Sequence, residues 1–241
     1  MKKLGIVAHS AEGASLCFIT ACRHGSDLLG PYMHPEIVMS AIPMALSMPG
    51  WESGDMDAVA EHLASGVRVA AEGGAEFYIC PDNTAHIVLE TTADTLPIPG
   101  LHIADVVCDE IRNRGFKRVG LTGTEWTMTG PVYERALRQS GTELIVPERG
   151  DREVIHSAIF DDLCHGRVTD SIVSDFIRIT EKLKDRGAEC VILGCTEIPL
   201  VLNDENSRLP TIDSTRLLAR RAIDLCVNDS ELVIRDGWVQ L

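Results

Sequence analysis

Two short polar segments of this chain contain residue types that can move protons. Asp82 lies in the segment PDNTAH (81–86), and Cys195 lies in the segment GCTE (194–197). A carboxyl group and a thiol can each act as a general acid or base. Each segment follows a short apolar run, and open α/β sheets bind ligands at the carboxyl ends of their strands. We therefore predict that Asp82 and Cys195 are catalytic; the alternative is that both are ordinary turn residues after a strand.

These two segments occupy matching places in an internal repeat. Residues 2–7 (KKLGIV) parallel residues 117–122 (KRVGLT), and residues 74–79 (GAEFYI) parallel residues 187–192 (GAECVI). Asp82 and Cys195 each lie eight residues beyond the glycine that begins the second pair of matches. The repeat indicates a duplicated unit, and two facing halves would bring Asp82 and Cys195 to one cleft.

Short apolar runs alternate with helical segments along the chain. The predicted strands are 4–8, 37–42, 77–80, 119–122, 144–146 and 190–193, and the predicted helices are 56–71, 104–113, 132–139, 153–163, 171–186 and 215–227. This alternation predicts an α/β fold of two similar domains related by pseudo-twofold symmetry, each a parallel sheet flanked by helices, with the active site in the cleft between them. The predicted domains are 1–115 and 116–227, with 228–241 as an extension and 214–241 able to return onto the first domain.

Composition narrows the class of protein. The 241 residues are 45% hydrophobic, which is enough for a substantial core, and a net charge of −14 disfavours nucleic acid as a partner. No apolar run approaches the roughly 20 residues that cross a bilayer, so no membrane association is predicted. His9, Ser10 and Glu12 interrupt the only stretch that resembles a signal peptide. Eight cysteines without a CxxC pair predict free thiols and a cytoplasmic protein.

The segments PDNTAH and GCTE resemble the two active-site loops of the aspartate/glutamate racemase family, which read approximately CNTxH and GCTE. Further segments carry the resemblance: LHIAD (101–105), GTEWTM (123–128), LCHG (163–166) and LPTID (209–213). It extends over nearly the whole chain to about residue 227, and residues 232–241 lie outside it.

The resemblance implies a cofactor-independent isomerase with two opposed acid/base groups, no metal, a small carboxylate or amino-acid substrate, and a homodimer. By this resemblance Cys195 is one catalytic residue. The positions implied to hold the substrate carboxylate are Asn83, Thr84, Thr124, Thr127 and Thr196. Thr124 and Thr127 can also serve as helix N-cap residues. Accessory candidates are His9, Ser10, His86, Glu197 and His165, of which His86 either orients the loop or is structural.

The chain departs from the family at Asp82, where the family has its first catalytic cysteine. The ordinary pKa values of Asp and Cys, about 3.9 and 8.5, differ by roughly 6 kcal/mol in proton affinity. We expect burial in a closed cleft to raise the pKa of Asp82, and loop N–H groups to lower that of Cys195. Met48 and Cys164 occupy positions where some family members place cationic groups for a side-chain carboxylate.

The sequence is compatible with three functions. The favoured one is an amino-acid racemase or epimerase that moves a Cα proton next to a carboxylate, using Cys195 and Asp82. The second is a single-cysteine decarboxylase or cis-trans isomerase of the same superfamily. The third is a small-carboxylate-binding protein that has lost its chemistry. The sequence contains no GxGxxG, GxxxxGK[ST], HExxH or GxSxG motif, which disfavours nucleotide, zinc-protease and serine-hydrolase chemistry.

Overall fold

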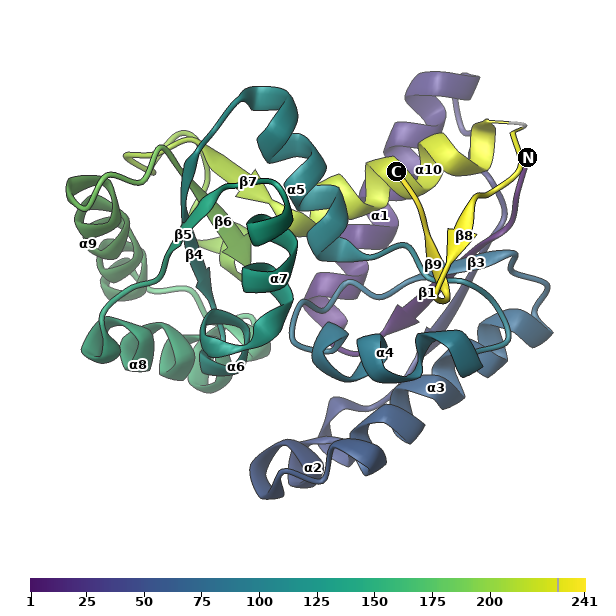
Figure 1. Cartoon of the computed structure of the whole chain (residues 1–241), viewed down its shortest axis with the longest axis horizontal. Helices are drawn as coiled ribbons and strands as arrows, with labels where there is room; N and C mark the ends of the chain where they lie inside the picture. Colours follow the sequence, from purple (N-terminus) through teal and green to yellow (C-terminus); the bar gives the residue numbers. More distant parts are fainter. Residues whose placement is uncertain (229) are drawn as a thin grey trace. The chain divides into compact units, whose positions relative to one another are not determined.

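The computed structural model describes residues 1–228 and 230–241, and only the backbone at residue 139. This described chain divides into two compact units (Figure 1). The first unit is Met1–Val106 with Thr215–Leu241, and the second is Val107–Ser214. The boundary between Val106 and Val107 lies slightly before the junction that the sequence predicted near residue 115. The segment 215–227, expected in the second half with a possible return to the first, belongs to the first unit.

The first unit is built on a parallel sheet with the strand order β2-β1-β3. Its strands are β1 (Leu4–Ala8), β2 (Ile37–Ala41) and β3 (Phe77–Ile79). Its helices are α1 (Ala11–Leu29), η1 (Met44–Leu46), α2 (Met48–Ser53), α3 (Met56–Glu72), α4 (His86–Thr92), η2 (Ala93–Thr95), the start of α5 (Ile103–Arg114) and α10 (Ser214–Val227). Because all three strands run the same way, the residues that follow β1 and β3 share one edge of the sheet.

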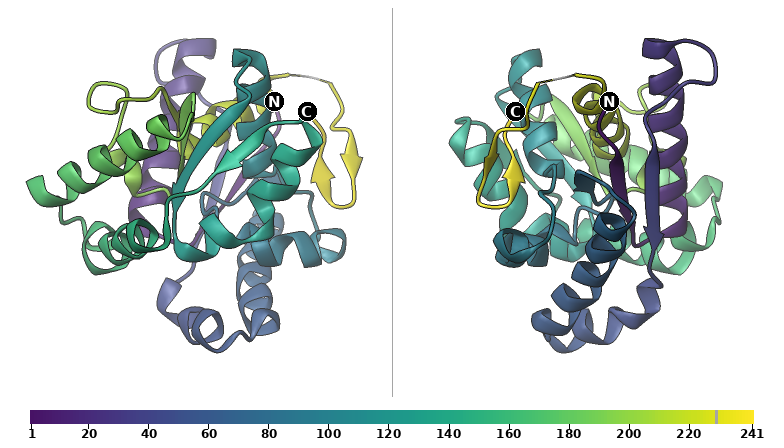
Figure 2. Two further views of the ribbon diagram at one scale, coloured as in Figure 1. Left: turned by 60° about the vertical axis from the view of Figure 1, so that its left-hand side comes forward. Right: turned by 90° about the vertical axis from the view of Figure 1, so that its right-hand side faces the viewer.

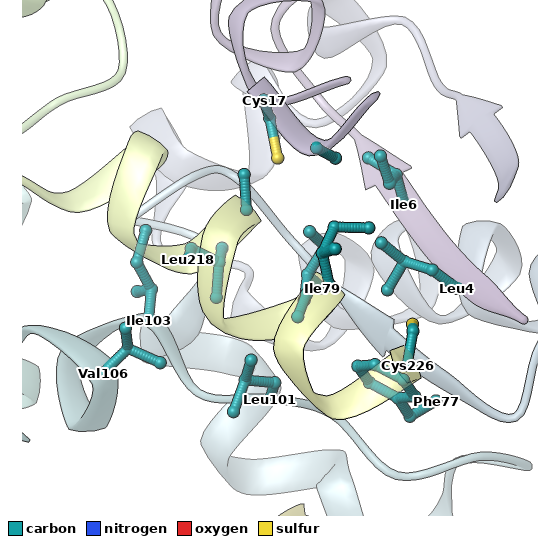
Figure 3. Packing of buried hydrophobic residues seen from close by; sticks show 14 of the residues in the cluster. Leu4, Ile6, Cys17, Phe77, Ile79, Leu101, Ile103, Val106, Leu218 and Cys226 are labelled. Carbon is teal, nitrogen blue, oxygen red and sulfur yellow. The ribbon is translucent and has the colours of Figure 1, made fainter. Parts of the chain in front are cut away.

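Alternation along β1 explains how this sheet is covered on both faces. Leu4 and Ile6 are fully buried in one apolar cluster with side chains of β3, α1 and α10 (Figure 3). The intervening residues Gly5 and Val7 face α3, where a Cβ on Gly66 would lie 2.9 Å from the Val7 side chain. Burial on both faces is the reason for the uninterrupted apolar sequence of β1.

The second unit contains a parallel sheet with the strand order β5-β4-β6-β7. Its strands are β4 (Arg118–Gly123), β5 (Glu143–Ile145), β6 (Cys190–Gly194) and β7 (Thr211–Asp213). Its helices are α6 (Glu125–Thr129), α7 (Pro131–Gln139), α8 (Arg149–Ser157), the π-helical turn η3 (Ala158–Asp162), η4 (Leu163–His165), α9 (Asp170–Asp185) and η5 (Ile198–Leu200). Both units therefore have the predicted α/β architecture.

The internal repeat has a structural basis within each unit. Gly74 and Gly187, which precede β3 and β6, both adopt positive φ values, 82° and 94°, that favour glycine. Two residues later, the Glu76 carboxylate accepts a hydrogen bond from the backbone N–H of Lys3. The Glu189 carboxylate accepts the equivalent bond from the N–H of Lys117. The repeated GAE sequence thus makes the same turn and the same strand contact twice.

A hairpin of β8 (Ile234–Arg235) and β9 (Trp238–Val239) completes the first unit; it is drawn in yellow in Figure 2. The N–H of Gly100 donates to the carbonyl of Gly237 at 2.9 Å, and the N–H of Val239 donates to the carbonyl of Gly100 at 2.8 Å. Gly100 itself bridges to Tyr78 of β3. The segment outside the family resemblance is therefore joined to the edge of the first sheet.

Several elements were missing from the sequence prediction, the largest being α1. Its sequence contains Gly13 and Gly25, which weaken helix propensity, but Gly25 is required where a Cβ would lie 2.6 Å from the Cβ of His34. The predicted helix 153–163 was wrong in its bounds, since α8 ends at Ser157 and a π-helical turn follows. None of the helices that the structure describes is long and apolar enough to cross a membrane.

Candidate active-site residues

Asp82 lies in the loop between β3 and α4, beside the residue that follows β1. Its Oδ2 atom lies 2.6 Å from Nδ1 of His9. Its Oδ1 atom accepts a hydrogen bond of 3.1 Å from the N–H of Ala85. The His9 side chain is 3% exposed and the Asp82 side chain is 18% exposed, so the pair is largely removed from water. The parallel pairing of β1 and β3 brings together these two residues, which are far apart in sequence.

The contact with His9 sets the protonation of Asp82. Burial acts to raise the pKa of Asp82, but the hydrogen bond and positive charge of His9 act against it. The N–H of Ala85 and the nearby His86 lower it further, and the resulting pKa lies below the ordinary value. The expectation that burial would raise the pKa of Asp82 was wrong in its net direction, because a partner that stabilises the carboxylate outweighs desolvation.

His86 holds the backbone of the Asp82 loop. Its Nδ1–H donates to the carbonyl of Asp82 at 2.8 Å, and its Nε2 accepts the N–H of Ile103 at 3.4 Å. Both bonds require the neutral ring with its hydrogen on Nδ1. Burial, followed by the electrostatic effect of the nearby His102, lowers the pKa of His86 to about 3. The structure thus gives His86 a positioning contact to the loop.

Two further aromatic side chains pack around His86. Trp238 stacks on it with a ring separation of 5.8 Å, and His102 contacts it edge-on at 4.6 Å. The Nε2–H of His102 donates to Glu90 at 2.9 Å, while its Nδ1 accepts the N–H of Ala104 at 3.1 Å. Trp238 carried no sequence signal for this role, because it lies in the segment outside the family resemblance.

Cys195 follows β6 directly and is paired with a carboxylate two residues later. Its thiol donates to Oε2 of Glu197 at 2.9 Å, and the Thr196 hydroxyl donates to the same oxygen at 3.0 Å. Cys195 is 8% exposed and Glu197 is 2% exposed. Among the described residues, the second oxygen of Glu197, Oε1, is buried without a hydrogen-bond partner.

Burial raises the pKa of Cys195 well above its ordinary value, and the charge and hydrogen bond of Glu197 add to this effect. The Cys164 thiol acts in the same direction. The backbone N–H of Glu197 does lower the pKa of Cys195, but burial and the Glu197 carboxylate outweigh it, so the expected net direction was wrong. The resting form is a thiol that donates to a carboxylate, and deprotonation of Cys195 requires an acceptor.

The other predicted residues are placed as follows. Gly123 pairs with Gly194 in register, so Thr124 and Cys195 follow neighbouring strands. Thr124 caps α6: its hydroxyl accepts the N–H of Thr127 at 3.1 Å and lies 3.1 Å from the Thr127 hydroxyl. Both threonines are buried, as are Asn83 and Thr84 of the Asp82 loop. Ser10 caps α1 by accepting the N–H of Gly13, and His165 is exposed at the end of η4.

Ser47 is a neighbour of His9 that the sequence did not indicate. Its hydroxyl lies 2.6 Å from Nε2 of His9 and donates to the carbonyl of Met44 at 2.9 Å. Over residues 1–228 and 230–241, no group of three or more His, Cys, Asp or Glu side chains could hold a metal ion. The polar groups are instead organised as two pairs, His9 with Asp82 and Cys195 with Glu197.

Comparison with known proteins places this arrangement in a family. The family described as Asp/Glu/hydantoin racemase matches residues 20–222, which include both loops. This chain belongs to that family. A broad specificity amino-acid racemase, RacX, of Bacillus subtilis (strain 168) is 28% identical over 170 residues, which are 70% of this chain and 73% of RacX.

Solved structures agree with the fold. The crystal structure of a candidate Asp/Glu racemase from Yersinia pestis has a TM-score of 0.85 and 29% sequence identity, covering 95% of this chain and 100% of that one. An aspartate racemase homologue from Pyrococcus horikoshii OT3 has a TM-score of 0.78 and 28% identity, again covering 95% and 100%. Parallel sheets flanked by helices are therefore the architecture of this chain and of its relatives.

Proposed function

We propose that this protein is an amino-acid racemase or epimerase that needs no cofactor, with Cys195 and Asp82 moving protons on opposite faces of a Cα next to a carboxylate. The observation that carries the proposal is the pairing at each strand end. Asp82 contacts His9 at 2.6 Å, and Cys195 contacts Glu197 at 2.9 Å. Each acid/base group thus has a buried partner that can exchange a proton with it. Membership of a racemase family supports an isomerase reaction.

The proposed reaction begins at Cys195. The thiol proton passes to Glu197: the S–H bond breaks and an O–H bond forms. The resulting thiolate removes the Cα proton, leaving an electron pair on carbon that the adjoining carboxylate stabilises. Asp82 takes a proton from its buried partner His9 and then protonates the opposite face: the Asp82 O–H bond breaks and a C–H bond forms. Inversion needs both groups, because the new proton must arrive on the face away from the one that left.

The substrate carboxylate is proposed to bind the polar groups beside the two acid/base residues. Thr124 and Thr127 stand at the start of α6, and Thr196 adjoins Cys195. Asn83 and Thr84 are the corresponding residues beside Asp82. Their amide and hydroxyl groups, or the adjoining backbone N–H groups, can donate to a carboxylate without the charge repulsion that an acidic side chain would bring.

Asp82 and Cys195 differ strongly in basicity, which predicts different rates of proton exchange for the two enantiomers of the substrate. Ordinary values already separate Asp from Cys by about 4.6 pKa units, or roughly 6 kcal/mol. The low pKa of Asp82 and the high pKa of Cys195 widen this separation. Proton removal by Cys195 should therefore be faster than removal by Asp82, so one enantiomer should exchange its Cα proton with solvent faster than the other.

The test measures Cα deuterium uptake and inversion for L- and D-amino acids in deuterated buffer. Asp82→Asn keeps the side-chain volume but removes the proton-transferring carboxyl, and it should suppress inversion while sparing exchange at Cys195. Asp224→Asn is the matched control, since Asp224 forms a partly exposed pair with His24 at 2.7 Å. Undiminished inversion in Asp82→Asn contradicts the two-base proposal. Label found only in a decarboxylated product, or no exchange of any substrate, would instead favour a decarboxylase or a binding protein.

A further inference from the structure

The hydrogen bonds around His9 fix where its first proton lies. The Ser47 hydroxyl has one hydrogen, and it donates this hydrogen to the carbonyl of Met44 at 2.9 Å. This direction leaves the hydroxyl oxygen, 2.6 Å from Nε2 of His9, as an acceptor. In this arrangement of hydrogen bonds, Nε2 of His9 carries a hydrogen.

This assignment determines what lies between His9 and Asp82. A neutral His9 with its hydrogen on Nε2 would present the lone pair of Nδ1 to Oδ2 of Asp82 at 2.6 Å. Two acceptors repel at that distance, whereas a charge-assisted hydrogen bond is short. The contact therefore holds one further proton, bound either to Nδ1 as an imidazolium or to Oδ2 as a carboxylic acid.

We propose that His9 is a positioning residue that stores the proton which Asp82 delivers to the substrate and takes from it. This inference rests on the proposed function. In delivery, the Nδ1–H bond of His9 breaks and an O–H bond forms on Asp82. The same O–H bond then breaks as Asp82 protonates Cα, and a C–H bond forms. The pair ends as neutral His9 and the Asp82 carboxylate. In the reverse direction, Asp82 removes the Cα proton and the proton returns to Nδ1.

A lone carboxyl group would rarely hold a proton that it could deliver to the substrate at neutral pH, and a proton stored on His9 removes this limitation. A group with an ordinary carboxyl pKa of about 3.9 is protonated in roughly one molecule in a thousand at pH 7, whereas a free imidazole, with a pKa of about 6.5, holds a proton about 400 times more readily. The His9 ring, 2.6 Å from the carboxylate, gives the proton a second site that a lone carboxyl lacks. The titratable groups that face the pair are His62, whose ring lies 6.4 Å from that of His9, together with His86 and Cys80 beside Asp82.

The His9→Asn variant distinguishes proton transfer by His9 from a hydrogen bond that merely holds Asp82 in place. The asparagine amide nitrogen can take the place of Nδ1 and donate to Asp82, but it cannot gain or lose a proton near neutral pH. We expect inversion to fall by about 100-fold or more, as for loss of a general acid or base, with KM and exchange on the Cys195 face within about threefold. The matched control is His24→Asn, which alters the His24–Asp224 pair and should retain wild-type inversion. Thermal melting checks that both variants fold.

Two results would overturn the proposal. The first is wild-type inversion in a folded His9→Asn, because a hydrogen bond alone would then suffice. The second comes from ¹⁵N NMR of the imidazoles in the resting wild-type protein: if Nε2 of His9 carries no hydrogen, the assignment of protons is wrong whatever the activity. A wild-type protein that inverts no amino acid contradicts the proposed function itself, and this outcome is distinct from a loss or retention confined to His9→Asn.

Discussion

His86 should make the first unit sensitive to mild acid. In the folded protein its pKa is about 3, because burial opposes the charged ring, whereas an exposed imidazole has a pKa of about 6.5. The unfolded chain therefore binds more protons between these values, and stability falls as the pH drops below 6.5. The loss approaches about 1.4 kcal/mol per pH unit, which gives about 2.6 kcal/mol between pH 7.5 and 4.5.

The perturbation is His86→Asn, which keeps a donor for the carbonyl of Asp82 but removes the titrating ring. The free energy of unfolding of the wild type and of the variant is compared at pH 7.5 and pH 4.5. The loss of stability between these values should be about 2.6 kcal/mol smaller in the variant than in the wild type. Asp82 contributes little to the change in stability between pH 7.5 and 4.5. Its lowered pKa gives stability that is present above pH 3.8 and is lost only as the pH falls further. His156 also has a lowered pKa, but it is common to both proteins and cancels.

Urea unfolding followed by tryptophan fluorescence measures this difference. The chain has three tryptophans, so a Trp126→Phe background leaves only Trp51 and Trp238, both in the first unit. His165→Asn, at an exposed histidine of the second unit, is the control and should retain the wild-type change. If His86→Asn and the wild type lose stability equally within about 0.5 kcal/mol, His86 is not the buried neutral group inferred from its contacts.

Four further outcomes are expected. Cys195→Ala should abolish turnover without unfolding the protein, and substrate should protect Cys195 of the wild type from alkylation; full activity in the variant contradicts its assignment. Glu197→Gln should shift alkylation of Cys195 to lower pH, because the carboxylate that helps to raise the thiol pKa is gone, and should lower turnover by about 100-fold or more; an unshifted profile argues against the pairing. Trp238→Ala should destabilise the first unit by about 3–5 kcal/mol in urea unfolding, as expected for a large buried aromatic side chain, and a loss below 1 kcal/mol would show that the hairpin does not support His86. Dialysis against a chelator should leave activity unchanged, and activity restored by an added metal would contradict a reaction without cofactors.

The sequence by itself determined the parallel α/β units and their loops, for a physical reason. Strands buried on both faces are apolar throughout, so β1 and β6 stand out as uninterrupted apolar runs, and β1 was predicted with its observed bounds. The repeated glycines at 74 and 187 were visible because only a residue tolerant of positive φ suits those turns. The family followed from the two loops, since motifs of adjacent residues are read directly from the chain.

Only the tertiary structure decided the protonation and support of these loops. His9 and Asp82 are 73 residues apart, and their contact depends on the pairing of β1 with β3. The sequence predicted a raised pKa for Asp82 and a lowered one for Cys195, and both directions were wrong. A pKa is set by the balance between desolvation and individual partners, and the identity of those partners is fixed only when distant segments meet. Trp238 reaches His86 for the same reason: its place follows from the hairpin that joins Gly100, which no local pattern encodes.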